Sequence, residues 1–251
     1  MARLYLGTSG YNYSHWRGVF YPQGLPGTEW IRYYATQFNT VELNVTFYRL
    51  PLAKTFANWY ERTPDYFRFA IKGSRLITHT RRLVEVQDVT QNFFDRAAGL
   101  NEKLGVVLWQ LPPGFKADLN RLSSFCDLLS SQPVARDARH AFEFRHQSWF
   151  IPEVYDLLAR YGYALCIADG PRWPQAREVT ADFVYLRFHG SRRLYSSCYS
   201  PEELSAWAGH IQRWLAEGRD VYAYFNNDVE GHAVANAREL RVAISQAGGS
   251  E

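Results

Sequence analysis

Cysteine is scarce in this sequence, with three residues among 251. Cys126, Cys166 and Cys198 lie far apart, are odd in number and form no CxxC pair. This pattern gives no disulfide framework and is typical of a reduced protein with incidental thiols. We therefore expect a cytoplasmic location.

Long apolar runs and linkers are also missing. The first residues, MARLYLGTSGYNYSHW, become polar too early for a signal peptide, and no stretch is long enough for a transmembrane helix. No proline- or serine-rich segment divides the chain, so we expect one domain over residues 1–251 and no membrane partner. The net charge of +3 is too small to indicate a nucleic-acid binder by itself.

What the sequence does contain is a repeated unit of a short apolar strand, a polar loop and a helical pattern. The expected strands are rich in β-branched or aromatic residues and span residues 4–10, 40–44, 67–74, 105–112, 141–146, 163–169, 183–190 and 220–227. Helical patterns cover residues 28–38, 54–63, 90–104, 117–131, 152–162, 200–218 and 233–249.

Eight strands alternating with about seven helices predict an α/β fold, the (β/α)₈ TIM barrel, with a doubly wound open sheet as the alternative. The sixth connection, residues 170–182, is short and proline-rich, so we expect its helix to be truncated or missing.

Polar side chains gather where the expected strands end. Barrel enzymes build their sites at the carboxyl ends of the strands, and seven of the eight strands place a charged or amide residue there. These residues, which we call the polar cup, are Glu42, Asn44, Lys72, Gln110, Glu143, Arg145, Asp169, Arg187, His189, Asn226 and Asn227. Buried charges usually pair, and the acids and bases of this set nearly balance.

The loops beyond the cup are basic and aromatic. Residues 72–83 carry Arg75, His79, Arg81 and Arg82 without an acid. Residues 10–22 and 147–150 contribute Tyr11, Tyr13, Trp16, Phe20, Tyr21, Trp149 and Phe150. Such a rim suits an anionic ligand with planar or sugar-like faces. The alternative is a solvated positive face whose aromatic residues pack the loops down.

Seven ordered motifs, spread over residues 6–237, resemble the YecE-like family, the domain of unknown function seventy-two. They are GTSGYNYSHWRGVFYP, VELNVTFYRLP, FRFAIKGSRLITHTRRL, LWQLPPGF, AFEFRHQSWF, YLRFHG and YAYFNND…GHAVANA. The resemblance implies a (β/α)₈ barrel, in agreement with the strand count, and names no reaction.

The cup favours an enzyme that acts on a small anionic, phosphate- or carboxylate-bearing molecule by acid/base chemistry, as a hydrolase, lyase or isomerase without a cofactor. The catalytic candidates are Glu143, Glu42, Lys72 and His189. The substrate-binding candidates are Arg145, Asn44, Tyr11, Arg75, His79, Arg187, Asp169, Asn226 and Trp149.

Two other functions stay open. One is an endonuclease-like phosphodiesterase that uses a metal, for which Glu42, Glu143, Asp169, His79 and His189 supply suitable ligand types. No HxH or HExxH pattern is present, and the cations in the cup would repel a divalent metal, so we expect no metal site. The other is a non-catalytic nucleotide or nucleic-acid binder. A glycosidase that uses Glu42 and Glu143 is disfavoured, because the nearby cations suit a neutral sugar poorly. The sequence leaves the oligomeric state open.

Overall fold

The computed structural model describes residues 1–247, and its eight strands form one sheet in the order β1-β8-β7-β6-β5-β4-β3-β2. A parallel bridge between Ser9, just after β1, and Glu42 in β2 joins the two ends of this order. Helices lie between the strands, so the predicted (β/α)₈ barrel is confirmed. The strands are β1 (Leu4–Thr8), β2 (Thr40–Leu43), β3 (Arg68–Lys72), β4 (Leu104–Gln110), β5 (Arg139–Glu143), β6 (Ala164–Asp169), β7 (Phe183–Phe188) and β8 (Asp220–Phe225).

Seven of the eight strands end one to three residues earlier than predicted. After β1 and β7 the cause is visible in the backbone, because Gly10 and Gly190 have φ angles of +91° and +94°, which extended chain does not adopt. Several residues of the polar cup, including Asn44, Arg145 and His189, therefore lie in the first residues of the loops.

The helices follow the predicted pattern with two additions. They are α1 (Trp30–Gln37), α2 (Val45–Tyr48), α3 (Ala53–Glu61), α4 (Gln87–Ala97), α5 (Leu119–Ser131), α6 (Pro133–Asp137), α7 (Pro152–Tyr161), α8 (Pro201–Ala216) and α9 (His232–Ala247). The short helices α2 and α6 were not predicted. Residues 170–182, all of them described, contain no helix, as expected for the sixth connection.

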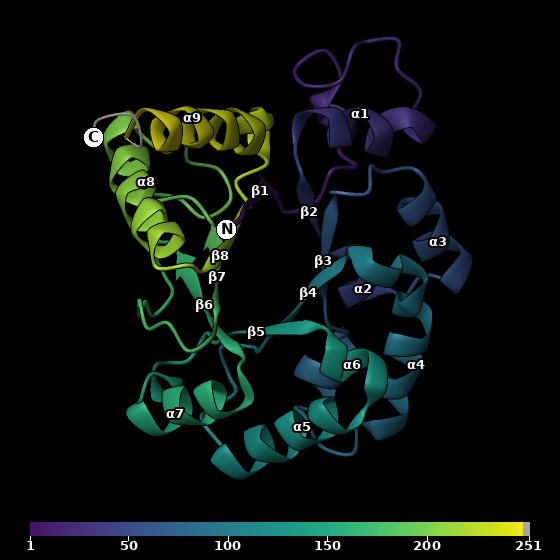
Figure 1. Ribbon diagram of the computed structural model, residues 1–251, viewed down its shortest axis with the longest axis vertical. Coiled ribbons are helices and arrows are strands. Elements are labelled where there is room, and N and C mark those ends of the chain that lie inside the picture. The colour runs from purple at the N-terminus through teal and green to yellow at the C-terminus, as the bar shows by residue number, and fades with distance from the viewer. Residues whose placement is uncertain (248–251) are drawn as a thin grey trace. The chain divides into compact units, whose positions relative to one another are not determined.

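The chain divides into two compact units. The first contains Met1–Glu42, Ile167–Gln175 and the described part of Asp182–Glu251. In this unit β8 pairs in parallel with both β1 and β7, and α8 packs along α9 (Figure 1). A capping box of Ser200 and Glu203 starts α8, as the sequence SPEE indicates. A hydrogen bond from His189 N to Asp169 O joins the ends of β6 and β7.

The second unit contains Leu43–Cys166 and Ala176–Ala181. Its strands β3, β4 and β5 pair in parallel, with Lys72 opposite Leu108 and Gln110 opposite Glu143. The buried ring of Trp109 lies so close to Gly73 that an added Cβ would be 2.2 Å from it. Glycine therefore allows the chain to leave β3 across the face of this ring.

The prediction of a single domain over residues 1–251 remains a prediction. Its last four residues, 248–251, lie outside the described residues, as do the last two of the helix expected over 233–249. Within residues 1–247 no helix has the length and apolar character needed to cross a membrane.

Four aromatic residues expected on an exposed rim are instead buried, which corrects that prediction for them. They are Trp16, Phe20, Tyr21 and Trp149. The Trp149 indole N–H donates to Phe115 O at 2.6 Å, and its ring stacks on Phe144 at 4.6 Å. Tyr21 stacks on Trp30 at 4.7 Å. Because these rings find partners within the fold, they pack the loops down.

Candidate functional site

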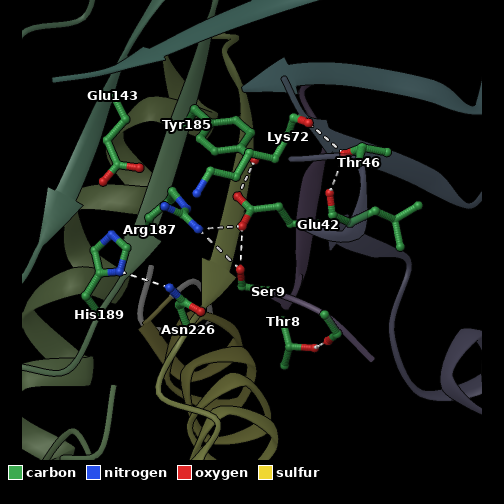
Figure 2. Close-up of polar contacts among 12 residues, drawn as sticks. Thr8, Ser9, Glu42, Thr46, Lys72, Glu143, Tyr185, Arg187, His189 and Asn226 are labelled. Atoms are coloured by element: carbon green, nitrogen blue, oxygen red, sulfur yellow. Dashed lines mark hydrogen bonds and ion pairs between the residues drawn. The ribbon is translucent and has the colours of Figure 1, made fainter. Parts of the chain in front are cut away.

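The first unit contains a fully buried carboxylate, Glu42 of β2. It forms an ion pair of 2.7 Å with Arg187 of β7, accepts a hydrogen bond of 2.7 Å from Tyr185 Oη, and accepts another from Ser9 Oγ (Figure 2). Arg187 Nη2 also lies 3.3 Å from Ser9 Oγ. We call these four residues the Glu42 network.

The network holds Glu42 in its charged form. Burial by itself would raise the pKa of this carboxyl, but the Arg187 guanidinium and the hydrogen bonds from Ser9 and Tyr185 outweigh burial and lower the pKa below its ordinary value. A carboxylate held by three donors is suited to orienting Arg187 and Ser9. It is poorly suited to delivering a proton.

His189 and Asn226 form a second contact in the first unit. The Asn226 amide nitrogen lies 3.1 Å from His189 Nδ1, and the imidazole is buried (Figure 2). An amide N–H can only donate, so a neutral His189 carries its proton on Nε2. Asp169, at the end of β6, is partly exposed and accepts a hydrogen bond of 3.2 Å from Gln175. Burial raises the pKa of Asp169, although hydrogen bonds to this carboxylate act in the opposite direction.

Tyr11 also belongs to the first unit and is partly exposed. Its carbonyl accepts a hydrogen bond of 2.5 Å from Tyr21 Oη, and its ring lies 6.1 Å from that of Tyr34. The turn after β1 is therefore held by buried tyrosines, and Tyr11 is its accessible member.

The second unit contains another buried ion pair, between Glu143 at the end of β5 and Arg145 two residues later. The expectation that buried charges of the cup pair with each other is confirmed for this pair and for Glu42 with Arg187. The backbone supports the position of Glu143, because Leu111 N donates to Glu143 O at 2.9 Å.

Lys72, at the end of β3, places its ammonium 4.2 Å from the centre of the Phe47 ring, a cation–π contact. Phe47 belongs to α2, and this helix is fixed to β3 by Thr46, whose hydroxyl donates to Lys72 O at 2.6 Å (Figure 2). Asn44, the residue before α2, is partly exposed. The short helix thus determines where the lysine side chain lies.

His79 lies among positive charges. Burial, and after it the charges of Lys72, Arg75, Arg145 and Arg82, together lower the pKa of its imidazole from 6.5 to about 4. The ring packs edge-on against Phe47 at 4.9 Å, and its Nδ1 lies 2.9 Å from Thr78 Oγ1. His79 is therefore neutral at pH 7, and four cations lie close enough to act on it.

The segment that carries His79 has unusual backbone geometry. Leu76–Thr80 is a π-helix, a form found frequently at functional sites. It is followed by Arg82, Leu83 and Glu85 in the left-handed region, with φ between 47° and 68°. Each such residue costs about 1–3 kcal/mol, and strain of this kind concentrates at functional sites. Arg75, exposed, immediately precedes the π-helix.

The predicted site residues thus fall into two groups. The first unit brings together Glu42 with Arg187, and His189 with Asn226. The second brings together Glu143 with Arg145, and Lys72, Arg75 and Arg145 around His79. We call Lys72, Arg75, His79, Arg82 and Arg145 the cationic cluster. Trp149 lies in the core and presents no surface to a ligand.

Sequence reasoning missed Tyr185 and Phe47. Tyr185 precedes Arg187 by two residues and so shares its face of β7, a spacing that could have revealed it. Phe47 carried no such signal, because α2 was not predicted. Among residues 1–247 no three His, Cys, Asp or Glu side chains are grouped closely enough to hold a metal ion.

Comparison with known proteins gives consistent results. The family model described as "Protein of unknown function DUF72" matches residues 5–250. The UPF0759 protein YunF of Bacillus subtilis (strain 168) is 25% identical over 94% of this chain and 93% of its own length. A crystal structure of a DUF72 family protein from Thermotoga maritima MSB8 is 29% identical, with a TM-score of 0.85 over 97% of this chain and 99% of that one.

A second DUF72 family crystal structure, from Enterococcus faecalis V583, is 20% identical and shares the fold, with a TM-score of 0.82 over 98% of this chain and 96% of that one. The family match extends over nearly the whole chain, as the seven motifs suggested. The chain belongs to the DUF72 family, which is also called the YecE-like family.

Proposed function

We propose that this protein is an enzyme that binds a small phosphate- or carboxylate-bearing molecule on the cationic cluster and acts on it by acid/base chemistry. One observation carries the proposal: the Lys72 ammonium and the His79 ring both pack against Phe47, at 4.2 Å and 4.9 Å from the centre of its ring. The exposed Arg75 immediately precedes the π-helix that carries His79. An anion placed there would gain attraction from Lys72 and the exposed Arg75, while Arg145 stays paired with Glu143.

The side chains have different roles in this proposal. Lys72 and the exposed Arg75 bind the anionic group, and the neutral His79 exchanges hydrogen bonds with it. Glu143, which forms a buried ion pair with Arg145, is the proposed general base. Hydrolase, lyase and isomerase reactions all fit this set.

The first unit supplies further candidates. Within that unit we propose Arg187, Asp169, Asn226 and His189 as groups that bind a polar ligand, and Tyr11 as a partly exposed ring that can contact one. Glu42 then acts by positioning Arg187. A cytoplasmic location is part of the proposal and is supported by the three free cysteines, Cys126, Cys166 and Cys198.

Anion binding is tested by thermal unfolding at fixed ionic strength with inorganic phosphate, pyrophosphate and citrate. A ligand at one hundred times its Kd adds about 2.7 kcal/mol to the free energy of unfolding. We expect at least one anion to stabilise the wild type, and Lys72→Ala and Arg75→Ala to weaken that effect. Lys54→Ala, which removes an exposed charge from α3, is the matched control. Equal stabilisation of all variants would contradict the proposal.

Catalysis is tested with a panel of phosphate esters and small carboxylic acids, followed by product analysis. Glu143→Gln keeps the size of the side chain and removes the base. We expect it to bind the anion and to lose turnover, typically by a factor of 10²–10⁴ for one acid/base group. An unchanged rate in this variant would refute the role of Glu143.

A further inference from the structure

Tyr48, the last residue of α2, is an aromatic side chain turned to solvent beside the cationic cluster. It is 77% exposed. Its ring packs against the Phe47 ring at 4.9 Å between centres, and the Lys72 ammonium lies 4.2 Å from the centre of that same Phe47 ring. The exposed ring and the cation therefore share one aromatic neighbour.

The helix from which this ring projects is held by several contacts. The Thr46 hydroxyl donates to Lys72 O at 2.6 Å and lies 3.0 Å from Leu43 O, so α2 is attached to β3. Phe47 is buried and touches His79 at 4.9 Å. Tyr48 therefore projects from a fixed backbone, and its ring has one packed neighbour, Phe47, and a face open to solvent.

We propose that Tyr48 is a stacking platform, and that the anion bound by the cationic cluster is carried on a planar aromatic ring, as in a nucleoside monophosphate. This inference rests on the proposed function, because it needs the cluster to bind the anion. The phosphate lies against Lys72 and Arg75, and the base lies on the Tyr48 ring.

Exposed tyrosines are common, so exposure alone does not distinguish Tyr48. What distinguishes it is the chain of ring contacts to the cluster. Tyr66, 58% exposed, lies before β3, at the opposite end of the strand from Lys72. It is a matched control, because it has the same side chain in the same unit without a place near the cluster.

The test measures Kd by calorimetry for inorganic phosphate, ribose 5-phosphate and adenosine 5′-monophosphate. We expect the nucleotide to bind more tightly than ribose 5-phosphate. Tyr48→Ala should weaken nucleotide binding roughly 5- to 150-fold, as for the loss of one base–aromatic stack. Its affinity for inorganic phosphate should not change, and Tyr48→Phe and Tyr66→Ala should behave as the wild type.

The outcomes separate the two proposals. If phosphate binds and the nucleotide binds no more tightly than ribose 5-phosphate, or if Tyr48→Ala leaves the nucleotide affinity unchanged, the platform is refuted and the anion site stands. If no anion binds, both are refuted. A short single-stranded oligonucleotide also carries a phosphate next to a planar base. If the oligonucleotide has a lower Kd than the mononucleotide, the ligand is a nucleic-acid strand; if not, it is a free nucleotide.

Discussion

The buried pair of Glu42 and Arg187 gives the sharpest test of the first unit. Arg187→Met removes the guanidinium while keeping a side chain of comparable length. The Glu42 carboxylate then remains buried, with Ser9 and Tyr185 as its hydrogen-bond donors in the network. Hydrogen bonds from neutral groups replace only part of the interaction with a full positive charge.

Removing one partner of a buried ion pair costs about 3–5 kcal/mol, because the remaining charge is desolvated without compensation. For a chain of this length each kcal/mol lowers Tm by about 2–4 °C, so we expect a fall of roughly 5–20 °C. The double variant Glu42→Gln with Arg187→Met should recover much of this loss, since it leaves no buried charge.

The effect should also depend on pH, with a definite sign. In the wild type the pKa of Glu42 lies below the ordinary value of 4.5, so the pair stabilises fully above that value and loses its effect as pH falls through the lowered pKa. In Arg187→Met burial dominates and raises the pKa of Glu42. The stability difference between the two proteins should therefore narrow as pH falls from 7 toward 4.

Denaturant unfolding at several pH values measures both effects. The control is Arg121→Met, which breaks a pair of 2.9 Å with Asp118 whose side chains are 44% and 37% exposed. Such a surface pair contributes about 0–1 kcal/mol. If Arg187→Met lowers the free energy of unfolding by no more than the control does, the Arg187 guanidinium does not stabilise the buried Glu42 carboxylate.

Three other predictions concern the second unit. NMR titration should give His79 a pKa of about 4, and Arg75→Ala should raise that pKa by removing one of the four cations. A pKa of 6.5 in the wild type would show that these cations do not act on His79. The folded-state pKa of His79 lies below the ordinary value of 6.5, so the unfolded chain binds more protons as pH falls from 6.5 toward 4. The free energy of unfolding should therefore fall by about 1–2 kcal/mol over that range, after a reduction for the partial exposure of the ring. A His79→Gln variant should show a shallower pH dependence of unfolding. Gly73→Ala should destabilise by about 1–3 kcal/mol, because its Cβ would meet Trp109 at 2.2 Å, and a neutral result would show that the ring moves aside freely.

The fold could be predicted because its signals are local. Runs of β-branched and aromatic residues mark the strands, and the start of α8 is encoded in Ser200 and Glu203. Strand ends were less accurate, since a strand stops where its ladder of hydrogen bonds stops. At Gly10 and Gly190 that depends on backbone angles, and a glycine permits a positive φ without requiring one.

The site could be predicted in part. Residue type and position near strand ends singled out Glu42, Arg187, Glu143 and Arg145 as candidates. They did not show that Glu42 pairs with Arg187, because β2 and β7 are far apart in sequence and are not neighbours in the sheet order. The prediction that aromatic residues such as Trp149 face a ligand was wrong for a different reason. A tryptophan such as Trp149 is amphipathic, and its sequence context does not distinguish a ring that meets solvent from one whose N–H finds a buried carbonyl.

Each unit contains a buried ion pair, and the second unit also places cations around His79. In the first unit Glu42 faces Arg187, Ser9 and Tyr185, so the charge is compensated and the side chains are fixed. In the second, Glu143 pairs with Arg145, and the charges that lower the pKa of His79 most are those of Lys72, Arg75, Arg145 and Arg82. His79 itself lies on the π-helix, which residues with left-handed backbone angles follow. Natural selection for stability alone would favour neither the strain nor the repulsion. An anion bound at the cationic cluster, as proposed, would relieve the repulsion.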